Sequence, residues 1–383
     1  MATSGEASSP GPDWDVIVVG AGIAGLTSAY RLLQQKPDCR ILVLEAKDRL
    51  GGRTFSAELQ GAHGKDTWDL GGQWVGSTQH HINWLLTELG LERYPQYTSG
   101  HKLMMLGSKG IRTYEASIPS MSCLSLLDLQ RFISSTDRIA ASIPVESPME
   151  APNADVLDSM TLDTIVRQNT WTQEAREAID VAINMIFGAQ PRTLSALFFH
   201  YYVSSAGSMR TLNEATQGSA QEYKIKGGAQ QICTLLAERI GQENVLLGQP
   251  VELIDQEEEE LVTVVTAEDR RFTCRHVIVA TPIHCSTDIS YSPDLPLARI
   301  SLAHHAPMAH LFKFIVTYKT AFWRETGYSG EIVSNGGKPS LSGLSSGPLQ
   351  LTFDCTTSKG NPALVGFYAN GREWSQVQPE IRK

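Results

Sequence analysis

Three glycines near the start of the sequence have a spacing that suits phosphate binding. In VIVVGAGIAG, Gly20, Gly22 and Gly25 form the pattern GxGxxG between an apolar run and a helical pattern. The first glycine allows a tight turn, the second lets backbone approach a pyrophosphate, and the third lets helix pack on strand. The helix N-terminus adds free N–H groups and the positive end of its dipole. The pattern therefore predicts a dinucleotide-binding turn.

An acidic residue at a suitable distance supports this prediction. Glu45 lies 20 residues after Gly25, at the end of a second apolar run. A carboxylate there can accept hydrogen bonds from both ribose hydroxyls, and it opposes a 2′-phosphate. NAD and FAD share this adenosine end, so Glu45 alone does not choose between them.

The residues that follow Glu45 favour FAD. The segment EAKDRLGGRT, residues 45–54, has a second glycine pair, Gly51 and Gly52, followed by Arg53. A longer cofactor running over this loop needs close backbone approach at the glycines. Arg53 would offer a fixed guanidinium fork to pyrophosphate oxygens or to the flavin side.

The elements that position these residues are a strand, a helix and a strand. Residues 15–20 form a short apolar run, residues 23–35 have apolar side chains at helical spacing, and residues 40–44 form a second apolar run. These three segments predict one βαβ unit. Other helices are predicted over 78–91, 123–142 and 171–187, and strands over 245–255, 261–267, 271–281, 311–318, 348–353 and 363–368. The acidic run 257–260 is interpreted as a solvated hairpin turn.

Composition excludes some classes of protein. The chain has 383 residues, with 32 Lys and Arg against 41 Asp and Glu, and a net charge of −9. This balance argues against nucleic acid as a partner. The six cysteines contain no CxxC pair, which favours a reduced, intracellular compartment. No run approaches the ~18 apolar residues of a membrane span.

The histidines do not suggest a metal site. His80 and His81 are adjacent, as are His304 and His305 with His310 nearby. Neither group has the spacing of a third ligand or a carboxylate partner. We predict structural or solvated histidines and no bound metal.

Six ordered motifs resemble those of the flavin-containing monoamine oxidase family. The motifs are VVGAGIAGL, LEAKDRLGGRT, DLGGQWVG (69–76), YKIKGGAQQI (223–232), VIVATP (277–282) and LFKFIVTYKTAFW (311–323). The resemblance covers nearly the whole chain after residue 12. It implies an α/β fold with a Rossmann-like FAD-binding domain, built from 13–94 and 225–301, and an α+β substrate-binding domain, built from 95–224 and 302–383. Residues 1–12 are predicted to be a disordered leader.

The resemblance also implies a set of FAD-binding residues. These are Gly20, Gly22, Gly25, Glu45, Lys47, Arg53, Thr54, Gly71, Gly72, Gln73 and Val251. Lys47 stands where the family usually has an arginine, so the charge remains but a bidentate contact is weakened. Trp74 would point toward the substrate, whereas the residues alone favour a core aromatic side chain.

Lys313 is the predicted catalytic residue. Alternation in LFKFIVTY places it on one strand face with Leu311 and Ile315, and apolar surroundings would lower its pKa. From the residues alone, an edge-strand lysine that reaches solvent is favoured, because buried lysines are rare. In the monoamine oxidases a lysine in this motif is linked through water to the flavin N5, so the resemblance implies that Lys313 holds that water and assists oxygen chemistry.

The resemblance places four apolar side chains along the substrate channel. They are Met185, Ile186, Leu212 and Leu351. Each could instead be an ordinary core residue, which is the commoner fate of such side chains.

The implied reaction is oxidative deamination of a primary or secondary amine. It yields an aldehyde, ammonia and hydrogen peroxide, with O₂ as the second substrate. A polyamine or amino-acid oxidase of the same fold, or an inactive flavin-binding protein, are the alternatives. The sequence leaves open whether the chain forms a homodimer. The predicted location of this chain is the cytoplasm, and the mitochondrial outer membrane is an alternative for a longer form.

The last predicted feature is the C-terminal end. After GFYANGREWSQVQPEIRK there is no counterpart of the family's final FAD segment, tyrosine pair or covalent flavin cysteine, and Cys355 lacks the attachment context. On this basis a shortened chain, weak FAD binding and low turnover are expected.

Overall fold

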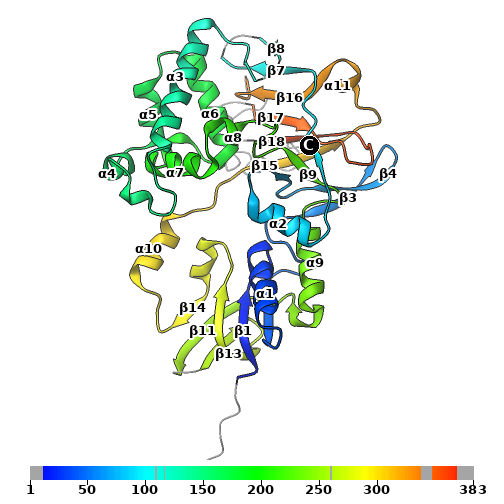
Figure 1. Cartoon of the computed structure of the whole chain (residues 1–383), viewed down its shortest axis with the longest axis vertical. Helices are drawn as coiled ribbons and strands as arrows, with labels where there is room; N and C mark the ends of the chain where they lie inside the picture. Colours follow the sequence, from blue (N-terminus) through cyan, green and yellow to red (C-terminus); the bar gives the residue numbers. More distant parts are fainter. Residues whose placement is uncertain (1–11, 108–109, 116, 259–260, 338–346, 369–383) are drawn as a thin grey trace, which may run out of the picture. The chain divides into compact units, whose positions relative to one another are not determined.

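The computed structural model describes residues 12–107, 110–115, 117–258, 261–337 and 347–368. The predicted leader, apart from Pro12, and the C-terminal stretch 369–383 lie outside these residues. The chain divides into two compact units, one formed by the segment up to Phe55 and Ala229–Met308, the other by Ser56–Gly228 and the segment from Ala309 (Figure 1).

The first unit is built on a mostly parallel sheet around the predicted βαβ core. Strand β1 (Trp14–Val19) pairs in parallel with β2 (Ile41–Leu44), and helix α1 (Ile23–Gln35) connects them. The sheet order is β10-β2-β1-β13-β12-β11-β14. The other strands are β10 (Val245–Leu246), β11 (Val251–Glu258), β12 (Leu261–Thr266), β13 (Arg271–Val279) and β14 (Ser290–Ser292). Strands buried on both faces explain the unbroken apolar runs in β1 and β2.

Two further α-helices lie in this unit. They are α9 (Gln231–Ile240) and α10 (Leu297–His305). Arg239 of α9 donates a hydrogen bond to the Tyr30 hydroxyl of α1 at 2.9 Å. Predicted strand 245–255 is in fact two strands, because Gly248 adopts a positive φ of 66° and turns the chain between β10 and β11.

The second unit contains a six-stranded sheet in the order β15-β18-β17-β16-β7-β8. These strands are β15 (Phe312–Thr317), β18 (Ala363–Tyr368), β17 (Leu349–Asp354), β16 (Tyr328–Ser334), β7 (His101–Met105) and β8 (Arg112–Tyr114). All neighbouring pairs are antiparallel except β16 with β7. The short helix α11 (Phe322–Glu325) precedes β16.

Two smaller sheets in the same unit were not predicted. The hairpin of β3 (Ser56–Gly61) and β4 (Gly64–Asp69) is one, and β5 (Trp74–Val75), β9 (Tyr223–Ile225) and β6 (Arg93–Pro95) form the other. Trp68 of β4 donates its indole N–H to the Cys355 carbonyl at 3.0 Å. This packing explains why residues 56–94 group with the second unit, whereas the sequence prediction carried the FAD domain to residue 94. The functional domain limits stay a prediction.

The helices of the second unit form a separate layer in Figure 1. They are α3 (Cys123–Ala140), α4 (Ala154–Asp158), α5 (Leu162–Asn169), α6 (Gln173–Phe187), α7 (Ala196–Ala206) and α8 (Met209–Asn213), with α2 (His80–Glu88) apart from them. Phe132, Ile183 and Phe199 lie in their shared core. Ser or Thr side chains cap α3, α5, α6, α7 and α8 by accepting a first-turn N–H, which fixes where each helix begins.

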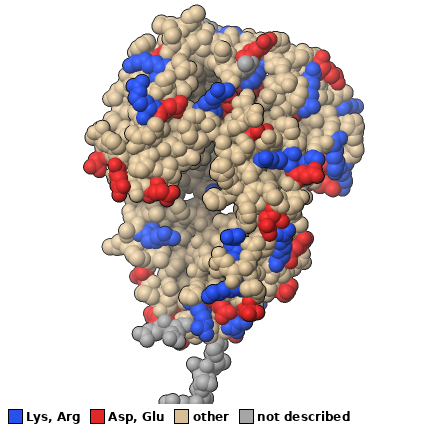
Figure 2. Space-filling model, viewed as in Figure 1, with Lys and Arg blue, Asp and Glu red and all other residues tan. Residues whose placement is uncertain are grey.

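Surface charge is mixed on the face shown in Figure 2, where Lys and Arg side chains lie among Asp and Glu. Within the described ranges, every helix is too short or too polar to span a lipid bilayer. The same residues contain no group of three or more His, Cys, Asp or Glu side chains arranged to hold a metal ion.

Candidate active site

The glycine turn at the start of α1 has the geometry that its residue types require. Gly20 has a φ of 109°, a conformation that side chains with a Cβ rarely adopt. A Cβ on Gly25 would lie 1.9 Å from the Gly20 carbonyl oxygen, so only glycine lets α1 approach this closely. Gly22 differs, because the nearest atom to a Cβ there would be the Gly51 oxygen at 4.0 Å. Open space at Gly22 is what close approach of a phosphate needs.

The N-terminus of α1 is open for a ligand. Gly22 is its N-cap, the backbone there is extended, and no side chain caps the helix. The first N–H groups of a helix need partners from outside it, and they suit an anion. The turn therefore fits the pyrophosphate of a dinucleotide.

Glu45 is buried at the end of β2, where it is 7% exposed. Its Oε2 accepts the backbone N–H of Ala21 at 2.7 Å, and Oε1 accepts that of Lys47 at 3.0 Å. Each carboxylate oxygen has a second lone pair for a further donor. Glu45 therefore ties the glycine turn to the next loop and retains acceptor capacity for ribose hydroxyls.

The loop after β2 is held by a residue that the sequence analysis did not select. Arg49 donates hydrogen bonds to the carbonyls of Leu50 at 3.1 Å, Gly52 at 3.0 Å and Thr54 at 3.3 Å. The five donors of a guanidinium group suit this task, and the charged residue ahead of a glycine pair was the available signal. Arg49 thereby shapes the loop.

The other predicted residues of this unit lie on or near that loop. Lys47 and Arg53 are exposed. Thr54 is buried, and its hydroxyl donates to the Gly51 carbonyl at 2.9 Å. Val251 begins β11 and packs against the core of the first unit. The Gln249 N–H, two residues earlier, binds the Glu45 carbonyl at 2.8 Å, which brings this segment close to the end of β2.

In the second unit, Lys313 lies against the glycines that follow β4. Its Nζ donates to the Gly71 carbonyl at 2.9 Å and to Gln73 Oε1 at 2.5 Å. Strand β15 is an edge strand in the described sheet, but the side chain binds inward rather than reaching solvent. Ile315 packs on the neighbouring apolar cluster, whereas Leu311 lies before β15 and is 37% exposed.

Electrostatics at Lys313 follow from its surroundings. Burial removes water from the ammonium group and lowers the pKa of Lys313 to about 8, against the opposing influence of Cys355 and Asp69. Gln73 is 4% exposed, and its Nε2 has no hydrogen-bond partner. A Cβ placed on Gly72 would have no other atom within 4 Å, so the space beside this residue is open. Beside Lys313, the Gln73 amide and the uncovered backbone at Gly72 therefore lie next to each other in the chain.

Trp74 is packed rather than free. Its ring lies 5.5 Å from Phe353 and 5.8 Å from Phe367, measured between centroids, and its indole N–H donates to Gln96 Oε1 at 2.9 Å. Lys313 Nζ is 5.9 Å from the Trp74 ring centroid. The side chain thus forms one wall beside Lys313.

A cavity of about 680 Å³ lies between the helical layer and the six-stranded sheet of the second unit. Two of the predicted channel residues, Met185 and Leu351, line it, together with Phe353. The other two pack elsewhere, since Leu212 is 7% exposed in the helical core and Ile186 packs against that core. Phe353 follows Leu351 by two residues on one strand, so strand alternation was the signal that could have found it.

A βαβ unit with a glycine turn and a carboxylate after the second strand defines the first unit as a dinucleotide-binding fold. Residues 23–383 match the family model of flavin containing amine oxidoreductases. The chain is 32% identical to amine oxidase [flavin-containing] A of Canis lupus familiaris over 386 residues, covering 100% of this chain and 70% of that protein. The chain belongs to the flavin-containing amine oxidase family.

Solved structures agree with this assignment. Cyclohexylamine oxidase from Brevibacterium oxydans IH-35A is similar with a TM-score of 0.87 and 30% identity, covering 97% of this chain and 79% of that one. Wild-type putrescine oxidase bound to putrescine is similar with a TM-score of 0.86 and 28% identity, covering 96% and 79%.

These findings confirm several expectations from the sequence. The fold class, the FAD cofactor and FAD-dependent amine oxidation are those of the family. The chemistry that bound FAD would supply is two-electron oxidation of the amine, with O₂ as the final acceptor of those electrons. The roles of individual residues are proposals.

Proposed function

We propose that the chain oxidises a monoamine with an apolar substituent, using O₂ as the electron acceptor. The observation that carries this proposal is the lining of the cavity of about 680 Å³. Apolar side chains make up much of its wall, among them Met104, Leu106, Met185, Leu351 and Phe353. An apolar wall favours a hydrocarbon group over a second charged amine.

Two of the three carboxylates that line this cavity are already paired with a basic side chain. Glu331 pairs with Lys102 at 2.8 Å, and Glu214 pairs with Arg210 at 3.3 Å. Asp137 accepts the Met209 N–H at 2.8 Å. A diamine would need an uncompensated carboxylate for its distal ammonium group, because a buried charge without a partner is costly. Pairing of Glu331 and Glu214 therefore supports a monoamine.

We assign FAD binding to the residues that the sequence selected. In the first unit the turn at Gly20, Gly22 and Gly25 takes the pyrophosphate, and Glu45 takes the ribose. The exposed side chains of Lys47 and Arg53 supply positive charge, while Thr54 and Val251 shape the site. In the second unit, Gly71, Gly72 and Gln73 offer backbone and amide groups to the flavin ring.

Lys313 is assigned to oxygen chemistry. Its pKa of about 8 means that a neutral amine and an ammonium group are both accessible near neutral pH. Two of the three possible Nζ hydrogen bonds go to Gly71 and Gln73, which leaves one direction for a water molecule. We therefore assign Lys313 to holding a water and donating a proton from Nζ, with Trp74 as the wall beside it.

The test compares substrates on one preparation of the FAD-loaded chain. Peroxide formation is measured with benzylamine, putrescine and phenylalanine, which represent a monoamine, a diamine and an amino acid. We expect kcat/KM for benzylamine to exceed the other two by about tenfold or more, or about 1.4 kcal/mol. Higher kcat/KM for putrescine would contradict the monoamine proposal and leave amine oxidation intact.

A pair of variants sharpens this comparison. Leu351→Glu places a new carboxylate in the cavity, and Leu351→Gln is its uncharged match. We expect the ratio of putrescine to benzylamine activity to rise in L351E relative to L351Q. An unchanged ratio would show that the cavity does not choose the substrate.

A further inference from the structure

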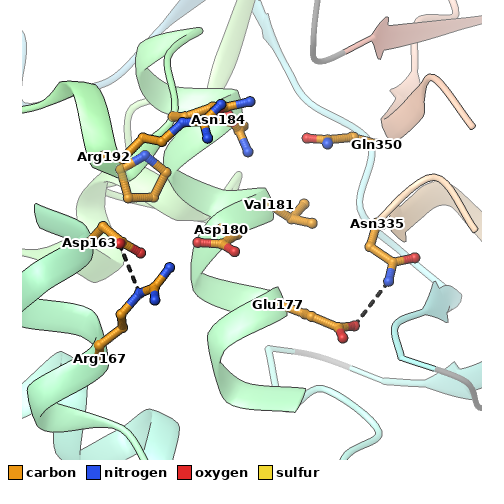
Figure 3. Close-up of a pocket in the computed structure, with 11 residues that line it drawn as sticks. Asp163, Arg167, Glu177, Asp180, Val181, Asn184, Arg192, Asn335 and Gln350 are labelled. Atoms are coloured by element: carbon orange, nitrogen blue, oxygen red, sulfur yellow. Dashed lines mark hydrogen bonds and ion pairs between the residues drawn. The ribbon is translucent and has the colours of Figure 1, made fainter. Parts of the chain in front are cut away.

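A second cavity in the same unit has a polar lining. The polar pocket, as we call it, has a volume of about 490 Å³ and lies between α5, α6, the segment 190–192 and the ends of β16 and β17 (Figure 3). Its lining includes the side chains of Asp163, Arg167, Glu177, Asp180, Asn335 and Gln350. Val181 lines both this pocket and the cavity of about 680 Å³, so the two share one wall.

Most charged groups of the polar pocket already have partners. Arg167 pairs with Asp163 at 2.8 Å, one turn earlier on α5. Glu177 accepts a hydrogen bond from Asn335 Nδ2 at 2.9 Å and from the Gly107 N–H at 2.5 Å. Figure 3 shows both of these side-chain pairs as dashed lines on the two sides of Asp180. These groups form the walls.

Asp180 is the carboxylate left over. Asp180 lies on α6, and in Figure 3 its carboxylate stands between Asp163 and Glu177 with no dashed line reaching it. Burial, followed by the charges of Asp163 and Glu177, raises the pKa of Asp180 to about 6, against the opposing influence of Arg167. A bound cation would offset both the burial of Asp180 and the repulsion from its acidic neighbours, because it stabilises the ionised carboxylate.

An independent observation on the facing strand also points to a ligand. Gln350 of β17 is 6% exposed, and its Oε1 has no hydrogen-bond partner. Its amide group points into the polar pocket from the side opposite α6 in Figure 3. A buried acceptor without a donor costs about 1–3 kcal/mol. A ligand that donates a hydrogen bond there would remove this cost.

We propose that the polar pocket binds a small organic cation of the amino-alcohol type, apart from the amine that is oxidised. Its primary ammonium group binds the Asp180 carboxylate, and a second donor, such as a hydroxyl, binds Gln350 Oε1. A metal ion is a poor match, because the volume of about 490 Å³ is much larger than a desolvated ion needs. Arg167 and Arg192, which line the pocket, disfavour a ligand with a second full positive charge.

The test uses a probe that the enzyme cannot oxidise. In 2-amino-2-methyl-1-propanol the amine stands on a carbon without hydrogen, so turnover at the flavin is not possible. Binding to the full chain is measured by calorimetry in a buffer without amines. We expect binding to wild type, a loss of about tenfold or more in Asp180→Asn, and no change in Asp155→Asn, whose side chain is exposed on α4.

A second comparison isolates Gln350. tert-Butylammonium chloride has the same ammonium group without the hydroxyl, so it should bind more weakly to wild type than the amino alcohol does. In Gln350→Leu this difference should disappear. Absence of amino-alcohol binding to wild type, or equal binding to wild type and D180N, would overturn the proposal. Neither result depends on amine oxidation, so the proposed function would stand or fall separately.

Discussion

Lys313 Nζ donates a hydrogen bond to Gln73 Oε1, 2.5 Å away, although the two residues are 240 positions apart in the sequence. The same nitrogen binds the Gly71 carbonyl at 2.9 Å. The lysine is therefore fixed against the DLGGQW segment, which the proposal places at the flavin.

Lys313→Met should separate the two halves of the reaction. The variant keeps the length and apolar contacts of the side chain but removes the proton at Nζ. We expect anaerobic reduction of the flavin by amine to change little, while reoxidation by O₂ slows by about tenfold or more. Stopped-flow absorbance measures each step. A variant with normal reoxidation would contradict the assignment, and Lys319→Met, on an exposed side chain, is the control.

Gln73→Glu should shift the pH dependence of reoxidation. A carboxylate beside the ammonium group stabilises the charged form of Lys313, so its pKa should rise above the present value of about 8. The pH at which reoxidation reaches half its limit should move upward in Q73E. In Gln73→Leu, by contrast, further loss of polar contact should move it downward. The same midpoint in both variants would contradict direct contact between these side chains in solution.

Stability should depend on pH through Lys313. Its folded pKa of about 8 lies below the value of 10.5 expected when the chain is unfolded, so the unfolded state binds more protons between these limits. Lys313 should therefore contribute up to about 3 kcal/mol more to the free energy of unfolding at pH 10.5 than at pH 8. Buried groups such as Cys233 and Tyr94, whose pKa values burial raises, act in the opposite direction over this range, so the contribution of Lys313 is measured as a difference between variants. Urea unfolding of wild type and K313M at both ends of the window measures this contribution. The change in the free energy of unfolding from pH 8 to 10.5 should be more favourable in wild type than in K313M, which lacks the group, and equal changes would contradict the prediction.

Two alanine variants of the glycine turn should behave differently. Gly22→Ala meets no atom closer than 4.0 Å, so the chain should keep its thermal stability but bind FAD about tenfold or more weakly. Gly25→Ala brings a Cβ within 1.9 Å of the Gly20 oxygen, so the variant should lose roughly 2 kcal/mol or more of stability. Thermal unfolding measures the stability of each variant, and titration with FAD measures its affinity for the cofactor. Unaltered FAD affinity in G22A would count against a pyrophosphate at this turn.

The local parts of the fold could be predicted from the sequence. Strand β1, helix α1 and strand β2 were predicted because apolar spacing and glycines act within a few residues. The hairpin of β3 and β4 was missed, because its strand SAELQG has polar residues on its exposed face and no continuous apolar run. Its place is fixed by a distant contact, from Trp68 to the Cys355 carbonyl.

The site was predictable only in part for the same reason. Glycines and Glu45 form a pattern along the chain, so they could be selected directly. The environment of Lys313 comes from Gly71 and Gln73, and sequence alone left both a buried and a solvent-exposed lysine open. Asp180 and Gln350 are 170 residues apart, and only the packing of α6 against β17 brings them to one pocket.

The most direct test of amine oxidation is a visible absorption spectrum of the FAD-loaded chain under nitrogen, before and after addition of benzylamine. We expect the band of oxidised flavin to bleach with the amine and to return when air is admitted. A spectrum that benzylamine, putrescine and cyclohexylamine all leave unchanged, with FAD demonstrably bound, would contradict the activity.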